Sequence, residues 1–258
     1  MRLSGGHPLT PHITVLDNGL TVVVQRAAAA PLASVQLRLS AGSADERPGE
    51  YGAAHFLEHM VFKGTPTRGV GAVSTEIEGL GGELNAYTTV DHTVLHATVE
   101  SSATVHALDV LADMATAPLL DPAETLNERD VVLDEIRSYA DDAGSCASDL
   151  ALDRCFVDHP YGRPVLGTTE SVRQLDHDAL RAFWRREWGA ERAVLVIAGD
   201  VEPEAMLKVM PSASQNTDCV SPLSHAAASI RPAAGSAAAA NDTFVVVATL
   251  AARLRCSS

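Results

Sequence analysis

The spacing of apolar positions predicts several short strands. Residues 34–40 alternate apolar and polar side chains with a period of two, which is typical of a strand with one face toward water. Two shorter apolar runs, 13–16 and 20–25, flank the sequence Asp-Asn-Gly at 17–19. A turn of this composition between two such runs predicts a β-hairpin. Further strands are expected at 83–88, 92–99 and 193–198.

Helical periods occupy most of the remaining sequence. Residues 51–62 are apolar on most sides of a helix, which predicts that this helix is buried. Asp121 followed by Pro122 is typical of a helix start. Asp caps the first turn, and Pro is tolerated at the first helical position because the N–H that it lacks would have no hydrogen-bond partner within the helix. This start opens a long, partly buried helix through residue 136. Other helices are expected at 70–80, 105–114, 147–156, 177–188 and 202–210.

The order of these elements predicts the fold class. Strand pairs alternate with helices, but without the regular strand–helix–strand repeat of a parallel sheet. We therefore expect an α+β fold, with a mainly antiparallel sheet and helices packed on one face. Residues 13–210 form the predicted folded domain, and residues 1–12 a loose leader. Residues 211–258 are rich in Ala and Ser, which predicts a poorly ordered tail with one strand-like run at 244–250.

Composition narrows the function classes. The formal net charge is −14, so nucleic acid is not expected as a partner, because phosphate binding needs a basic face. No run of about 18 apolar residues occurs, so no membrane span is expected. No secretory signal is visible, which makes the cytoplasm the predicted location. The four cysteines have no C-x-x-C spacing and are interpreted as reduced thiols.

Candidate chemistry centres on the sequence His-Phe-Leu-Glu-His at 55–59. Positions four apart lie on one face of a helix, so His55 and His59 can both bind one metal ion. Glu58 projects at the edge of that face, where its carboxylate can take a proton from water activated by the metal. Chance gives this spacing in roughly 2% of chains of this composition. Catalytic zinc usually has three protein ligands, so a third must come from elsewhere in the chain.

The long helix that follows Asp121 offers the third ligand. Glu128 and Glu135 are seven residues apart and share a face. Spacing alone does not decide between Glu128, Asp134 and Glu135, and acidic residues on a helix are often only a solvated surface. Two alternatives remain at this point: a metal-free protein with a chance motif, or core histidines satisfied by backbone groups. His92 and His96 are interpreted as residues on a strand face, not as ligands.

A series of short motifs in a fixed order is more specific than the pentapeptide. From about residue 15 to residue 208, the chain resembles the pitrilysin/insulinase family of zinc peptidases, whose motif is H-x-x-E-H. It is similar to bacterial members and to the processing (beta) subunit of the mitochondrial processing peptidase. The motifs are LDNGL (16–20), AGS (41–43), GAAHFLEHMVFKGT (52–65), NAYT (85–88), ERDVVLDEI (128–136), HPYG (159–162) and AGDV (198–201).

The resemblance assigns roles to individual residues. It implies that His55, His59 and Glu135 bind Zn²⁺ and that Glu58 is the catalytic base. Glu128 matches a further acid of the family with a supporting role in catalysis. The strand with the NAYT motif is implied to be an exposed edge, where the peptide substrate pairs as an added strand. The substrate-binding residues on this strand are Leu84, Asn85 and Ala86.

The resemblance also implies a function and partners. We expect a zinc-dependent endopeptidase that hydrolyses peptides or processes precursor segments. Family members enclose the peptide between two similar halves, and residues 13–210 match the N-terminal catalytic half. The second half is expected from a partner subunit or from a homodimer. The alternative is a truncated or non-catalytic half that binds zinc and needs a partner subunit for activity.

Overall fold

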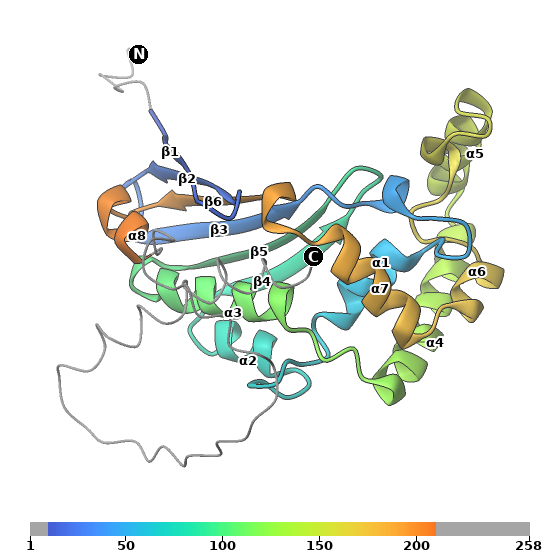
Figure 1. Ribbon diagram of the computed structural model, residues 1–258, viewed down its shortest axis with the longest axis horizontal. Coiled ribbons are helices and arrows are strands. Elements are labelled where there is room, and N and C mark those ends of the chain that lie inside the picture. The colour runs from blue at the N-terminus through green and yellow to red at the C-terminus, as the bar shows by residue number, and fades with distance from the viewer. Residues whose placement is uncertain (1–9, 210–258) are drawn as a thin grey trace.

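A six-stranded sheet organises the structure, which is a computed structural model that describes residues 10–209 (Figure 1). The strand order across the sheet is β1-β2-β6-β3-β5-β4. The predicted tail, its strand-like run at 244–250 and most of the predicted leader lie outside the described residues. The strands are β1 (His12–Val15), β2 (Thr21–Arg26), β3 (Leu32–Leu39), β4 (Glu83–Thr88), β5 (Thr93–Glu100) and β6 (Ala193–Gly199).

The sheet is mixed, with one parallel pair. The pairs β1–β2, β3–β5, β3–β6 and β4–β5 are antiparallel, whereas β2–β6 is parallel. Strands β2 and β3 run in opposite directions, and β6 lies between them. A strand inserted between two opposed neighbours must be parallel to one of them. The predicted mainly antiparallel sheet is therefore confirmed, with this parallel pair as a feature that strand patterns alone do not reveal.

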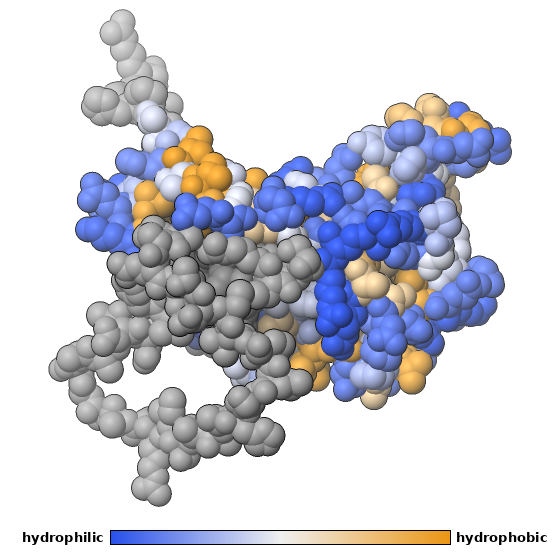
Figure 2. Space-filling view, in the orientation of Figure 1, coloured by the Kyte–Doolittle hydropathy of each residue, from blue (hydrophilic) through white to orange (hydrophobic). Residues whose placement is uncertain are grey.

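Helices cover one face of the sheet. Along β3, the buried residues Ala33, Val35 and Leu37 alternate with more exposed ones, as the period of two predicts. Helices α2 (Ala72–Glu78) and α3 (Thr104–Thr116) lie along this sheet in Figure 1, with α3 against β3 and β5 and α2 against β4. On the face shown in Figure 2, hydrophobic residues are exposed near β1, where Ile13 and Val15 are both 63% accessible.

A second group of helices packs beside the sheet (Figure 1). Helix α1 packs against α7, α4 and β4, and therefore connects this group to the edge of the sheet. The group consists of α1 (Ala53–Met60), α4 (Pro122–Ala140), α5 (Ala143–Cys155), α6 (Thr169–Gln174) and α7 (His177–Glu187). Helix α8 (Pro203–Val209) packs against β2, and short 3-10 helices span Ser43–Asp45, Ser101–Ala103, Pro160–Gly162 and Ala190–Arg192.

Helix boundaries follow the capping chemistry. The Asp121 side chain accepts hydrogen bonds from the N–H groups of Ala123 and Glu124, which confirms the predicted start of α4. Helix α1 begins later than predicted, because Gly52 adopts a left-handed conformation (φ +94°). Helix α6 was not predicted; it is a short helix with a capping box at Thr168. In the described residues, no helix has both the length and the hydrophobicity for crossing a membrane.

Candidate metal centre

The two histidines of the pentapeptide lie one turn apart on α1. The ring centroids of His55 and His59 are 4.7 Å apart, in an edge-to-face arrangement. Helix α1 is buried along most of its length, including Ala53, Phe56 and Leu57. Burying two imidazoles in such surroundings costs free energy wherever a polar nitrogen has no partner.

The main partner is Glu135, which projects from α4. Its Oε1 lies 3.6 Å from Nε2 of His55, and its Oε2 lies 3.3 Å from Nε2 of His59. Potential ligand atoms of these three residues all lie within 4.8 Å of one another. Asp134, which sequence spacing left as a candidate, is exposed and pairs with Arg137 on its own helix. The fold therefore brings Glu135, and not Asp134, to the histidines.

The spacing of these atoms fits a tetrahedral metal. Nitrogen and oxygen ligands at about 2.0–2.2 Å from zinc lie roughly 3.3–3.6 Å from each other. Each Nε2 lies at this separation from one oxygen of Glu135, His55 from Oε1 and His59 from Oε2. Three protein ligands leave the fourth position for water or substrate, as in catalytic zinc sites.

The protonation state of His55 also favours metal binding. Burial, and then the charge of His59, lower the pKa of His55 to about 4. The neutral ring at physiological pH gives a metal a nitrogen lone pair without first releasing a proton. In the described residues, Nδ1 of His55 has no hydrogen-bond partner. A cation between Nε2 of His55 and the half-buried Glu135 carboxylate would offset the negative charge of Glu135 and give buried His55 a partner.

Glu128 contacts a histidine and not the proposed metal position. Its Oε1 lies 2.9 Å from Nδ1 of His59, and its Oε2 pairs with Nζ of Lys63. When Nδ1–H of His59 donates a hydrogen bond to this carboxylate, the ring proton stays on Nδ1 and the lone pair of Nε2 faces Glu135. Glu128 is only 6% exposed, and Lys63 compensates its negative charge. This geometry fits a residue that orients His59.

Glu58 lies beside the three converging side chains. Its Oε2 is buried without a hydrogen-bond partner among the described residues, and the Thr88 side chain hydrogen-bonds the carboxyl group. Burial raises the pKa of Glu58, against opposing effects of Thr88 and His59. An incompletely solvated carboxylate next to a potential metal position is suited to accept a proton from water.

Strand β4 lies at the edge of the sheet, next to this centre. It pairs only with β5 among the described strands, so its other edge has no strand partner there; the N–H of Ala86 donates to Oδ1 of Asn85 (2.8 Å). Leu84 is buried, Asn85 is exposed and Ala86 is half-buried. Thr88 ends the strand and contacts Glu58. The free edge therefore leads directly to the candidate base.

The comparison with family models decides the family. The model of the insulinase family (peptidase family M16) matches residues 21–169, which include the pentapeptide, Glu128 and Glu135. The chain belongs to the insulinase family. The expected pitrilysin/insulinase resemblance is thereby confirmed.

Curated relatives and a solved structure extend this finding. A zinc protease of Mycobacterium tuberculosis is 39% identical over 202 residues, covering 78% of this chain and 46% of that protein. An Arabidopsis thaliana protein named as a mitochondrial-processing peptidase subunit beta is 36% identical over 196 residues, covering 76% of this chain and 37% of that protein. The crystal structure of a Helicobacter pylori protease superposes with a TM-score of 0.74 at 25% identity, covering 78% of this chain and 48% of that one. The chain thus spans about half of the length of these insulinase-family proteins, or less.

Two histidines considered in the sequence analysis lie outside the candidate metal centre, and two contacts in the centre were not predicted. His92 contacts Arg38 and Thr89, and His96 lies on β5, so neither belongs to the His-His-Glu group. Sequence analysis gave no role to Lys63 or to the Thr88 side chain. Both contacts join segments far apart in the chain, and no local pattern marks them. Cys146 and Cys155 are free and exposed.

Proposed function

We propose that this chain is the metal-bearing half of a zinc-dependent endopeptidase that hydrolyses peptides or processes precursor segments. The observation that carries the proposal is the convergence of His55, His59 and Glu135 beside a half-buried Glu58. The zinc-protease names of its relatives support the choice of metal and of reaction. A cytoplasmic location and the lack of a nucleic-acid partner remain predictions.

The proposed roles follow from the contacts. His55, His59 and Glu135 would hold the zinc ion. A zinc ion bound there supplies Lewis acidity, which polarises the scissile carbonyl and lowers the pKa of the attacking water. Glu58 accepts the proton of that water and delivers it to the leaving amine. Glu128 orients His59 and acts through it, so we assign it a positioning role in place of direct catalysis.

The proposed substrate is a peptide in extended conformation. Main-chain hydrogen bonds to a free sheet edge give affinity without demanding one sequence. The free edge of β4 offers such bonds, and α1 packs against the same strand. Leu84, Asn85 and Ala86 would then lie beside the scissile bond. Their backbone groups would align the peptide with Glu58.

A partner completes the proposal. The chain matches 46% of the length of the M. tuberculosis relative. We propose that the metal-bearing half acts together with a second half, from a partner subunit or a second copy. Groups from that half would contribute to stabilising the oxyanion, and one missing donor of this kind can cost about 10²–10³ in rate. The alternative function is a zinc-binding half that is inactive without its partner.

A peptidase assay with zinc-loaded chain tests the proposal. The substrate is a mixed pool of quenched fluorescent peptides, and bound zinc is counted per chain. Glu58→Gln should retain one zinc per chain and lose at least about 10²-fold in rate, since it cannot accept a proton. Glu124→Gln is the control, because Glu124 is a half-buried glutamate in the first turn of α4 and is not part of the His-His-Glu group; it should cleave like the wild type.

The possible outcomes separate the alternatives. Cleavage that only Glu58→Gln lacks supports the endopeptidase. One bound zinc without cleavage by any variant supports the half that needs a partner. A purified chain that binds no zinc in the absence of chelators would overturn both readings.

A further inference from the structure

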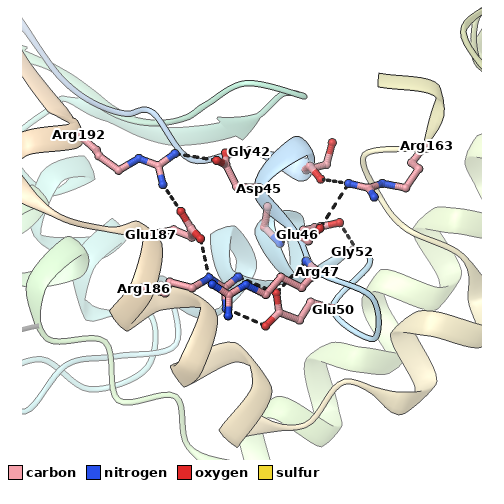
Figure 3. Close-up of polar contacts among 12 residues, drawn as sticks. Gly42, Asp45, Glu46, Arg47, Glu50, Gly52, Arg163, Arg186, Glu187 and Arg192 are labelled. Atoms are coloured by element: carbon pink, nitrogen blue, oxygen red, sulfur yellow. Dashed lines mark hydrogen bonds and ion pairs between the residues drawn. The ribbon is translucent and has the colours of Figure 1, made fainter. Parts of the chain in front are cut away.

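A buried carboxyl group outside the metal centre contacts the start of α1. Glu46 lies in the loop between β3 and α1 and is 5% exposed. Its Oε2 accepts a hydrogen bond from the N–H of Gly52 (3.0 Å), and its Oε1 accepts one from the N–H of Ala54 (2.9 Å). Figure 3 shows Glu46 next to Gly52, with the surrounding charged residues. Both oxygens of one side chain therefore bind the beginning of the helix that carries the pentapeptide.

Helix α1 has no local residue that could replace this contact. The first N–H groups of any helix lack acceptors within the helix. The N-cap of α1 is Gly52, which has no side chain for capping and a left-handed backbone. A Cβ at this position would lie 2.8 Å from the carbonyl oxygen of Leu166, so a capping Ser or Asp does not fit there. The cap is instead supplied from six residues upstream.

The loop that carries Glu46 is itself anchored. Nη2 of Arg163 donates to the carbonyl oxygens of Ser43 (3.0 Å) and Glu46 (3.4 Å), and its guanidinium lies 4.5 Å from the ring centroid of Tyr51. Ion pairs hold the loop on both sides of Glu46: Asp45 with Arg192 at 2.7 Å, and Glu50 with Arg186 at 2.6 Å.

Glu187 completes this network on α7. It contacts both Arg186 and Arg192, so it connects the two ion pairs at either side of the loop (Figure 3). Helix α7 also packs against α1. The loop therefore has fixed points on the helix group that surrounds the metal centre. Movement of Glu46 relative to α1 would require these contacts to break.

We propose that Glu46 is a positioning residue for the metal centre. Two hydrogen bonds to N–H groups two residues apart determine both the height and the rotation of the first helical turn. His55 directly follows Ala54, and Glu58 lies one turn later on the same helix. Site geometry has to be kept within about 0.5 Å and 10–20°. Glu46 would hold His55 and Glu58 toward α4 and β4 within such limits; this inference rests on the proposed metal site.

Cobalt binding to the full chain tests the proposal without requiring peptidase activity. Co²⁺ affinity is measured by competition with a chelator, and the visible absorption of the bound Co²⁺ reports ligand geometry. Glu46→Gln keeps the size of the side chain but turns one acceptor oxygen into an NH₂ group that faces a backbone N–H. Changes to residues supporting metal ligands typically cost about 10–100-fold in affinity. We expect a loss of at least about tenfold and an altered spectrum.

Asp176→Ala is the matched control. Asp176 caps α7 through the N–H of Ala179 (2.8 Å), on a helix that packs against α1 but has no proposed ligand. It should lower the melting temperature of the metal-free chain and leave both affinity and spectrum unchanged. All measurements are made well below the melting temperature of each variant.

Arg163→Lys is a second test variant, because it loosens the loop while keeping Glu46. It should weaken Co²⁺ binding less than Glu46→Gln does. If Glu46→Gln does not fold, Arg163→Lys is used for the test in its place.

Three results would overturn the inference. Wild-type affinity and spectrum in Glu46→Gln would mean that the cap is not needed for the metal centre. Equal weakening in Asp176→Ala would mean that any loss of a helix cap in this group has the same effect. A wild-type chain that binds neither Co²⁺ nor Zn²⁺ would reject the proposed function, and this inference with it.

Discussion

Helices α1 and α4 both carry proposed metal ligands, but they are held in different ways. Helix α4 has its own N-cap, Asp121, and much of its surface faces solvent, including Leu126 and Val131. Helix α1 has no cap of its own, is buried on most sides and takes its first-turn acceptor from Glu46. A helix with local caps keeps its start through neighbouring residues. A buried helix without them depends on contacts made elsewhere in the fold.

The largest expected difference is in zinc affinity between variants of two neighbouring acidic residues of α4. Glu135→Gln should weaken zinc binding by orders of magnitude, because it removes one of three ligands. Asp134→Asn changes the adjacent acid, which is exposed, and should keep wild-type affinity. Chelator competition on the two variants measures the difference. Equal affinities would mean that α4 does not present Glu135 to the histidines as described.

A second difference concerns the stability that each helix contributes. Phe56 on α1 is fully buried, so Phe56→Ala should cost about 3–5 kcal/mol in unfolding free energy. Val131 on α4 is 49% exposed, and Val131→Ala should change the unfolding free energy by no more than about 0.5 kcal/mol. Urea unfolding of the metal-free variants checks both values. A similar cost for the two substitutions would contradict the different burial of the helices.

The last expected effect is a change of stability with pH that depends on the cap of α1. Burial raises the pKa of Glu46 from 4.5 to about 8, against the opposing backbone hydrogen bonds and Arg163, and with a small further increase from Glu50. The folded state thus binds more protons than the unfolded state between these pH values. The stability contributed by the neutral form is complete below pH 4.5 and is lost as pH rises through about 8.

Comparison with Glu46→Gln isolates this effect, because Gln does not titrate. From pH 5 to pH 9, the wild type should lose stability relative to the variant by an amount on the order of a few kcal/mol. Urea unfolding of the metal-free proteins at several pH values gives the two curves. Parallel curves would show that Glu46 keeps an ordinary pKa in the folded chain.

Local patterns predicted much of the fold and of the candidate site. The period of two in 34–40 predicted β3, and Asp-Pro at 121–122 predicted the start of α4. The four-residue spacing of His55 and His59 predicted one shared face. These features involve residues within about one or two turns, so backbone geometry alone determines them. The pairing of β2 with β6, by contrast, joins residues such as Val22 and Leu195, which no local pattern connects.

By itself, the sequence determined that this chain carries an insulinase-type pentapeptide on a buried helix, with acids on one later helix. Helical spacing left Glu128, Asp134 and Glu135 open, and only the family resemblance pointed to Glu135. The tertiary structure decided that the Glu135 carboxylate lies next to both histidines and that Glu128 contacts Nδ1 of His59. It also revealed that Thr88 contacts Glu58 and that Glu46 caps α1. The physical reason is the separation along the chain of the residues in contact. Helical spacing is set by bonds between near neighbours, whereas these contacts depend on how distant elements pack around a shared core.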